Sequence, residues 1–97
     1  MPTYVTLFKW TEQGVKEVKN APMRFQASKK LTESMGGKML GLYVTMGEYD
    51  VVAVSEGPTD EVAAAVALSI AAKGNVKTVT MRAFTENEFS EIVKKVV

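Results

Sequence analysis

The sequence predicts a protein of the α+β class. Four segments show the two-residue alternation and the enrichment in β-branched and aromatic residues that are typical of strands. Two segments with helical spacing lie between the first and second strands and between the third and fourth. Only a short turn separates the second strand from the third. The 97 residues are the length of one domain, so we expect a single domain over residues 1–97.

The first predicted strand, Thr3–Trp10, presents different side chains on its two faces. Val5 and Leu7 point to one face. The opposite face carries Tyr4, Thr6, Phe8 and Trp10. The strand breaks at residues 11–14, and a short helical turn is predicted over residues 15–19.

The first long helix is predicted to start at Asn20-Ala21-Pro22, because the missing N–H of proline costs nothing in the first turn of a helix. It ends at Gly36-Gly37, since glycine accepts the left-handed conformation of a helix cap. Arg24, in the first turn, either reaches the edge of the sheet or is simply solvated, and solvation is the expectation. The face that turns to the sheet is predicted to carry Phe25, Ser28, Leu31 or Thr32, and Met35.

The second half of the chain contains three more strands and another helix. Strands are predicted at Met39–Thr45 and Asp50–Glu56, joined by a turn short enough for a hairpin. A helix over residues 61–73 is capped by Thr59 or Asp60. The last strand, Val76–Phe84, follows it.

A further helix is predicted at the end of the chain. Thr85 and Glu88 have the spacing of a capping box, which satisfies the free amides at a helix start. The apolar stripe of this helix consists of Phe89, Ile92, Val93 and Val96. We therefore expect an extra C-terminal helix outside the βαββαβ core.

The order of the elements restricts the topology. Strand–helix–strand crossovers are right-handed, and the middle hairpin pairs with itself. The compact solution is a ferredoxin-like βαββαβ domain. Its four-stranded antiparallel sheet has the strand order 4-1-3-2, with both main helices on one face.

Two helices leave the other face of the sheet without cover. We expect this face to carry the aromatic side of the first strand, because aromatic residues with polar tips tolerate a half-wetted surface. The second strand adds Met39 and Tyr43, and the fourth adds Thr78, Thr80 and Arg82. A face this apolar predicts a homo-oligomer, a dimer or larger. The apolar residues around most of the helix at 61–73 support the same expectation.

The composition restricts the chemistry. The chain has no cysteine and no histidine, which excludes disulfides, thiolate catalysis, histidine-ligated metals and Ser-His-Asp triads built within it. We therefore expect no metal and no cofactor. The net charge of +1 argues against nucleic-acid binding. No apolar run reaches the length of a membrane span and the start lacks the features of a signal peptide, so we expect a cytoplasmic protein.

An ordered series of short motifs gives a more specific indication. It comprises Thr11-Glu12-Gln13-Gly14, Pro22-Met23-Arg24, Gly47-Glu48-Tyr49-Asp50, Glu56-Gly57-Pro58, Gly74-Asn75-Val76-Lys77-Thr78 and Thr80-Met81-Arg82-Ala83-Phe84. From Tyr4 to Phe84 the chain resembles the GYD domain family, named for its Gly-x-Tyr-Asp signature. The resemblance implies a ferredoxin-like domain akin to the dimeric α+β barrels. It implies no reaction, because relatives of that fold include cofactor-free enzymes, haem-handling proteins and ligand sensors.

Four polar side chains are candidates for chemistry. Asp50, Tyr49 and Glu56 are the candidate catalytic residues, although Asp50 equally suits a role in capping turn amides. An arginine in the middle of a strand needs an anionic partner. For Arg82 that partner is Glu56, another subunit, or an anionic ligand.

Three functions fit these residues. The first is an oligomeric module that binds a small molecule, such as an organic anion, with Tyr4, Phe8, Trp10, Tyr43 and Arg82 as the ligand-binding residues. The second is a cofactor-independent enzyme of the monooxygenase or isomerase type. The third is a purely structural homo-oligomeric interaction domain. A cavity lined by Asp50, Tyr49 or Arg82 distinguishes the first two from the third.

Overall fold

The computed structural model describes residues 1–97, and every predicted strand and long helix is present. The elements are β1 (Thr3–Trp10), α1 (Glu12–Lys16), a 3-10 turn (Val18–Asn20), α2 (Ala21–Ser34), β2 (Lys38–Val44), β3 (Val51–Glu56), α3 (Asp60–Ala71), β4 (Val76–Ala83) and α4 (Glu86–Val93). The short helix after β1 begins earlier than predicted. The hydroxyl of Thr11 accepts a hydrogen bond from the Gly14 amide at 3.0 Å and caps it there.

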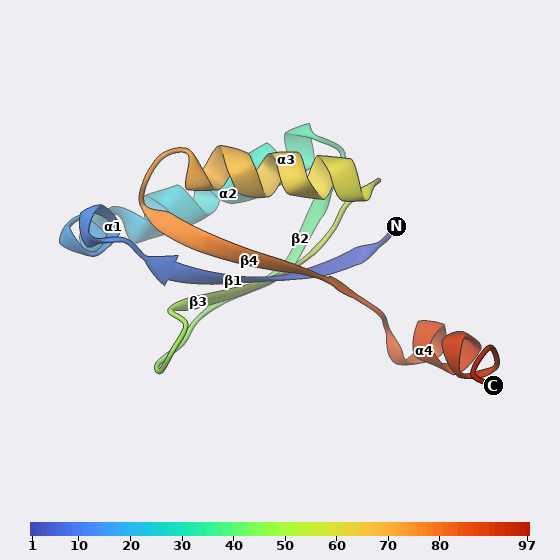
Figure 1. Ribbon diagram of the computed structural model, residues 1–97. Coiled ribbons are helices and arrows are strands. Elements are labelled where there is room, and N and C mark those ends of the chain that lie inside the picture. Colours follow the sequence, from blue (N-terminus) through green and yellow to red (C-terminus); the bar gives the residue numbers. More distant parts are fainter.

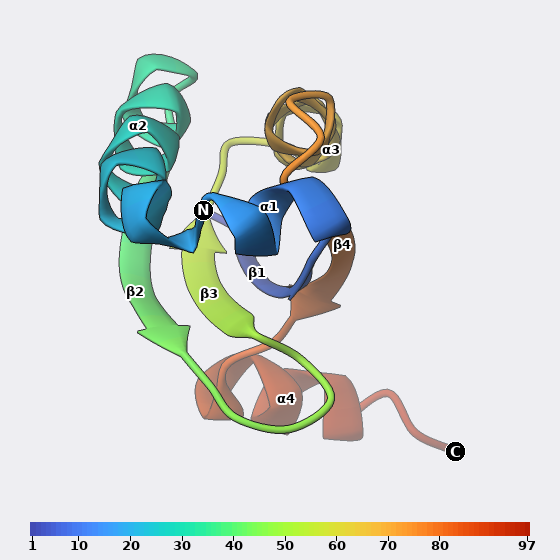
Figure 2. The ribbon, with the colours of Figure 1, turned by 90° about the vertical axis from the view of Figure 1, so that its left-hand side faces the viewer.

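The four strands form one antiparallel sheet in the order β2-β3-β1-β4, which confirms the predicted order read from the other edge. Helices α2 and α3 lie together on one side of this sheet (Figures 1 and 2). Thr59 caps α3 through its side chain, and Gly36 and Gly74 take positive φ values just after α2 and α3. The capping residue before α3 and the glycines that end α2 and α3 therefore act as predicted.

The prediction of which face of β1 meets the helices was wrong. Phe8 is buried with Val51 and Ala53 in the core, where Phe25 of α2 and Ile70 of α3 pack against them. The two faces of β1 are both largely apolar, so alternation alone does not orient the strand. The aromatic side lies under the helices, and Tyr4, Phe8 and Trp10 belong to that side.

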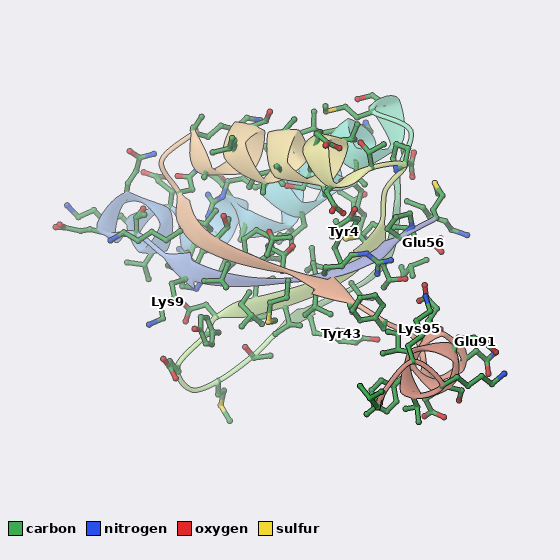
Figure 3. All side chains as sticks on the ribbon, turned by 45° about the vertical axis from the view of Figure 1, so that its right-hand side comes forward. Tyr4, Lys9, Tyr43, Glu56, Glu91 and Lys95 are labelled. Atoms are coloured by element: carbon green, nitrogen blue, oxygen red, sulfur yellow. The ribbon has the colours of Figure 1, made fainter.

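The same error extends to the neighbouring strands. Thr78, Thr80 and Arg82 lie opposite Phe8, Thr6 and Tyr4, so they share the helix side of the sheet. Met39 also packs against the helix-side core, because a register shift between Met39 and Gly41 changes the alternation of β2. Tyr43 keeps its predicted place on the uncovered side, and Figure 3 shows it across the sheet from Tyr4.

The uncovered side of the sheet is nevertheless apolar. We call it the open face; it consists of Val5, Leu7, Tyr43, Val52, Val54, Val79 and Met81. Tyr43 is 65% exposed, Val79 47% and Met81 43%. The argument for a partner therefore holds, but it now rests on aliphatic side chains and not on the aromatic set.

The chain as a whole exposes much surface for its mass. Its accessible area is 6565 Å², whereas a compact monomer of this mass has about 5,500 Å². Its radius of gyration is 14.5 Å, compared with about 12.5 Å for a compact domain of this length. Part of the excess comes from α4, which extends away from the body beyond the end of β4 (Figure 1).

Gly14 is required where α1 passes over the turn before β4. A Cβ added there would lie 1.9 Å from the carbonyl oxygen of Asn75. We expect Gly14→Ala to lower the free energy of unfolding by about 1–3 kcal/mol, because the backbone must move apart. Gly57→Ala is the matched control, since its Cβ would make an ordinary contact at 3.5 Å with Tyr4. Equal urea midpoints for the two variants would contradict this packing.

Candidate functional site

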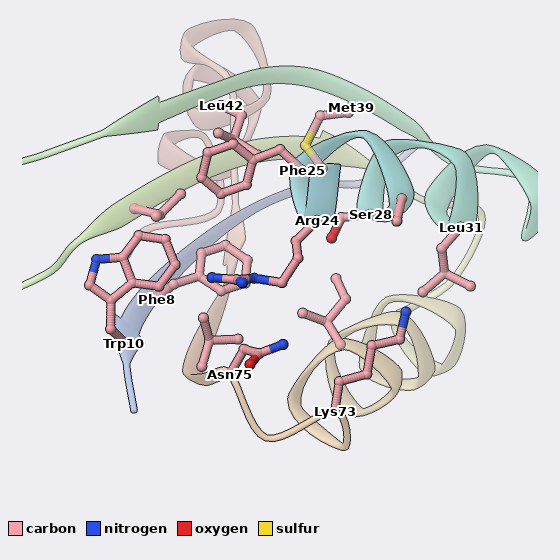
Figure 4. A pocket seen from close by; sticks show the side chains of 14 residues that line it. Phe8, Trp10, Arg24, Phe25, Ser28, Leu31, Met39, Leu42, Lys73 and Asn75 are labelled. Carbon is pink, nitrogen blue, oxygen red and sulfur yellow. The ribbon is translucent and has the colours of Figure 1, made fainter. Parts of the chain in front are cut away.

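A cavity of about 80 Å³ lies between the sheet and helices α2 and α3 (Figure 4). We call it the helix-side cavity. Most of its wall is apolar, with four polar side chains at its border. The lining residues are Phe8, Trp10, Arg24, Phe25, Ala27, Ser28, Leu31, Met39, Leu42, Val51, Ile70, Lys73, Asn75 and Val76.

Trp10 and Phe25 form one wall of the helix-side cavity. Their rings stack with centroids 6.3 Å apart and planes inclined by 21°. The Trp10 amide donates to the carboxylate of Asp50 at 2.8 Å, which fixes the end of β1. Trp10 is therefore fixed twice: its backbone amide bonds to Asp50, and its indole ring stacks on Phe25.

Arg24 lies over the same wall. Its Nη1 donates to the carbonyl of Glu17 at 2.9 Å and its Nη2 to that of Gly14 at 3.2 Å. Its guanidinium carbon is 5.8 Å from the centre of the Trp10 ring, within the range of a cation–π contact. The expectation that Arg24 is merely solvated was wrong. The carbonyls that hold it belong to α1 and to the residue that follows it, and backbone carbonyls have no signature in the sequence.

A smaller recess of about 40 Å³ lies under α3 near the other end of the sheet, and Tyr4 and Glu56 help to line it. The Tyr4 hydroxyl donates to Asp60 Oδ1 at 2.5 Å. Burial of the ring and then the hydrogen bond to the Asp60 carboxylate raise the pKa of Tyr4 above its ordinary value. Tyr4 is therefore a buried hydrogen-bond donor at neutral pH.

Arg82 does not pair with Glu56. Its guanidinium lies 4.6 Å from the ring centre of Phe84 and 5.9 Å from that of Tyr4. Its Nη2 is 3.8 Å from the carboxylate of Glu88 in α4. The Glu56 alternative was wrong, because α4 supplies a carboxylate close to the guanidinium. Arg82 joins β4 to the start of α4 and lines neither of the two cavities described above.

The connection between β2 and β3 contains Gly47, Tyr49 and Asp50. Gly47 has a φ of 107°, a conformation that favours glycine. The Tyr49 carbonyl accepts a hydrogen bond from the Thr45 hydroxyl at 2.6 Å, and Lys9 lies 5.2 Å from the centre of the Tyr49 ring. Together with the bond from the Trp10 amide to Asp50, these contacts tie the hairpin to the end of β1.

Comparison with known proteins gives the family. The sequence model of the GYD domain matches residues 4–93. The chain belongs to the GYD domain family. The match runs to the last residue of α4, so the C-terminal helix, which the motifs of the resemblance did not reach, lies within the family's domain.

Two comparisons link this GYD domain to proteins of Thermus thermophilus, one by sequence and one by structure. The relative by sequence is named a glutamine synthetase and cystathionine beta-lyase binding protein; it is 31% identical over 84 residues, which is 86% of this chain and 88% of the relative. The structural match is to a crystal structure, with a TM-score of 0.57 and 23% identity, and it covers 88% of this chain and 95% of that one. The second likeness supports the fold alone.

The signature residues of this GYD domain have structural roles in the hairpin. Gly47 permits the turn, and the carboxylate of Asp50 accepts a hydrogen bond from the Trp10 amide of β1, a structural contact with a neighbouring strand and not with a turn amide. Asp50 and Glu56 lie at opposite ends of β3, about 20 Å apart at the rise of a strand. The three candidate catalytic residues therefore do not meet at one cavity.

The other predicted site residues are also distributed over the GYD domain. Phe8 and Trp10 line the helix-side cavity, and Tyr4 lines the smaller recess. Tyr43 lies on the open face, and Arg82 contacts α4. No group of three acidic side chains is close enough to hold a metal ion. None of the helices has both the length and the apolar character needed to cross a membrane.

Glu88 makes the attachment of α4 dependent on pH. The hydrogen bond that it accepts from the Thr85 amide at 2.9 Å, together with the nearby charge of Arg82, holds the pKa of Glu88 below its ordinary value of 4.5. A carboxyl with a lowered pKa contributes stability above its unfolded pKa, and that contribution is lost as the pH falls through the folded value. We expect the protection of the amides in residues 86–93, measured relative to the intrinsic exchange rate at each pH, to decrease below pH 4.5.

The matched variants for this prediction are Glu88→Gln and Glu91→Gln. Glutamine at position 88 keeps an oxygen for the Thr85 amide but removes the titrating charge, so the acid-induced change should disappear. Glu91 pairs only with the exposed Lys94, and its replacement should leave that change in place. An identical pH profile in the wild type and Glu88→Gln would contradict the role of Glu88.

Proposed function

We propose that this GYD domain is a protein-binding module of ferredoxin-like topology, formed by residues 1–97 as one domain. Its open face binds a second copy of the chain, as in the dimeric α+β barrels. The assembled form then presents the helix layers outward. The open face is the single observation that carries this proposal.

The chemistry of the open face suits burial. Its centre is made of Val5, Leu7, Val52 and Val54 on the two middle strands, with Val79 and Met81 along β4. A contiguous apolar surface of this kind on one side of a sheet marks an interaction site. A two-fold interface buries the same surface on both copies, so one such face is sufficient for a dimer.

The large accessible area of the chain also supports self-association. The accessible area exceeds that of a compact monomer by about 1,100 Å². A stable interface buries about 800 Å² on each partner. Covering the open face therefore brings the exposed area per chain close to the ordinary value.

The relative from Thermus thermophilus supports a role in binding proteins, since its name describes it as binding two enzymes. We propose that this chain, as a homo-oligomer, likewise binds another protein. The exposed apolar residues of α4, Phe89 at 59% and Val93 at 48%, offer a surface separate from the open face for that contact.

Sedimentation velocity over a series of concentrations tests the self-association. The proposal predicts a species heavier than 10.6 kDa that persists at low micromolar concentration. A single 10.6 kDa species at several hundred micromolar would contradict it.

Binding of a small molecule is the second candidate function, and the helix-side cavity favours it. Its volume of about 80 Å³ is well below the roughly 300–1,000 Å³ of sites for drug-sized ligands. The candidate ligand is therefore small. A cofactor-independent enzyme finds less support, because Glu56 lies at the opposite end of β3 from Asp50 and Asp50 already accepts a backbone hydrogen bond.

A further inference from the structure

The helix-side cavity has a charge imbalance at its border. Arg24 of α2 and Lys73, just after α3, both line it, and no acidic residue does. Neither side chain makes an ion pair with a carboxylate of this chain. Two cationic side chains from different segments therefore line one apolar cavity that no acidic side chain lines.

We propose that the helix-side cavity binds a short-chain carboxylate, with its alkyl tail inside and its carboxylate between Arg24 and Lys73. This inference deepens the second candidate function and does not depend on the open face. The positive charges of Arg24 and Lys73 favour an anionic head group, and the apolar lining favours an alkyl tail.

Arg24 is held in position before any ligand arrives. Two of its N–H groups donate to the carbonyls of Glu17 and Gly14, and the guanidinium lies over the Trp10 ring. A guanidinium has five N–H donors, so others remain for a carboxylate. Because the side chain is already ordered, binding costs less conformational entropy. Asn75 and Ser28 add neutral polar groups at the same border (Figure 4).

The volume sets the length of the tail. A cavity of about 80 Å³ is several times the roughly 10–15 Å³ that a single water needs, and far smaller than a site for a drug-sized ligand. Phe8, Leu42 and Ile70 provide the apolar wall. A tail of about three carbons fills the space, as in butyrate. Acetate leaves most of it empty, and octanoate exceeds it.

Trp10 provides a specific reporter, because it is the sole tryptophan and lines the helix-side cavity. Titration of the full chain with butyrate should change its fluorescence to saturation. Acetate should bind about tenfold more weakly, since it lacks two buried methylene groups. Octanoate should also bind more weakly than butyrate. Butylammonium, which has a similar tail and the opposite charge, should give no saturable change.

Three variants test the charged border. Lys73→Gln should weaken butyrate binding three- to tenfold, whereas Lys77→Gln, which removes the same charge from β4 outside the cavity, should leave it unchanged. Arg24→Gln should weaken binding by at least tenfold. Arg24→Gln also loses the two hydrogen bonds to backbone carbonyls, so its melting temperature is measured to separate weaker binding from loss of stability.

Ser28→Leu keeps the inference testable if Arg24→Gln fails to fold. It fills the cavity without removing a charge, and butyrate binding should be lost. The Val79→Lys variant, which lies on the open face, should bind butyrate normally, so failure of the self-association proposal leaves this result intact.

Three outcomes would overturn the inference. They are equal binding of butyrate and butylammonium, equal losses in Lys73→Gln and Lys77→Gln, and the absence of any saturable response to butyrate in the folded wild type. The first would leave a ligand cavity without selection for an anion. The third would remove the carboxylate ligand but would leave the cavity available to an uncharged small molecule.

Discussion

Phe8→Ala is expected to lower the free energy of unfolding by about 3–5 kcal/mol, the cost of removing a phenyl ring from a core. Phe8 is 8% exposed and contacts the core with Val51 and Ala53. In a domain whose total stability is about 5–15 kcal/mol, this loss is a large share. Denaturation in urea, followed by far-UV circular dichroism, measures it.

Leu7→Ala is the matched control for Phe8→Ala. Leu7 is the neighbouring residue on the same strand and points to the open face. Its replacement should cost less when both variants are measured as monomers, for example in the Val79→Lys background. A greater loss for Leu7→Ala than for Phe8→Ala would show that the helices cover the other face of β1.

Val79→Lys is expected to weaken self-association by about a hundredfold or more. Val79 is 47% exposed on the edge strand β4, so the folded monomer tolerates a lysine there. In an interface, the ammonium loses its water without gaining a partner, which costs about 3–5 kcal/mol. A hundredfold change corresponds to about 2.7 kcal/mol. Analytical ultracentrifugation measures the dissociation constant.

Leu68→Lys is the matched control for the open face. Leu68 is 70% exposed on α3, in the helix layer on the opposite side of the sheet. The substitution is again from an exposed aliphatic residue to lysine, and assembly should remain at the wild-type level. Dissociation by Leu68→Lys with no effect of Val79→Lys would move the interface to the helix layer.

The elements and their order could be predicted from the sequence because local signals specify them. Thr85 and Glu88 form the capping box that begins α4, and Gly36 adopts the left-handed conformation after α2. The turn between β2 and β3 leaves no room for a helix, which leads to the observed strand order. These features depend on residues that are close together in the chain.

The orientation of β1 could not be predicted in the same way. Tyr4 was expected outside because of its hydroxyl, yet that hydroxyl bonds to Asp60, 56 residues away, and so the ring is buried without an unsatisfied donor. In β2, the register shift next to Gly41 moved Met39 to the helix side. A glycine inside a strand is a known sign of a bulge and was the one available signal.

The candidate site was predicted only in part. Phe8 and Trp10 do line the main cavity, although from the face opposite to the one expected. Arg24 was missed because its partners are the backbone carbonyls of Gly14 and Glu17, which any residue type provides. Arg82 stood out in the sequence as a lone strand arginine, and its partner Glu88 lies in the terminal helix.

Isotope-filtered NMR on a mixture of labelled and unlabelled chains tests the central claim most directly, because it detects only contacts between copies. We predict intermolecular NOEs to the methyl groups of Leu7, Val79 and Met81 on the open face. None are expected to Val62 or Val66, which lie on α3. Intermolecular NOEs confined to α3, or none at any concentration, would contradict the account.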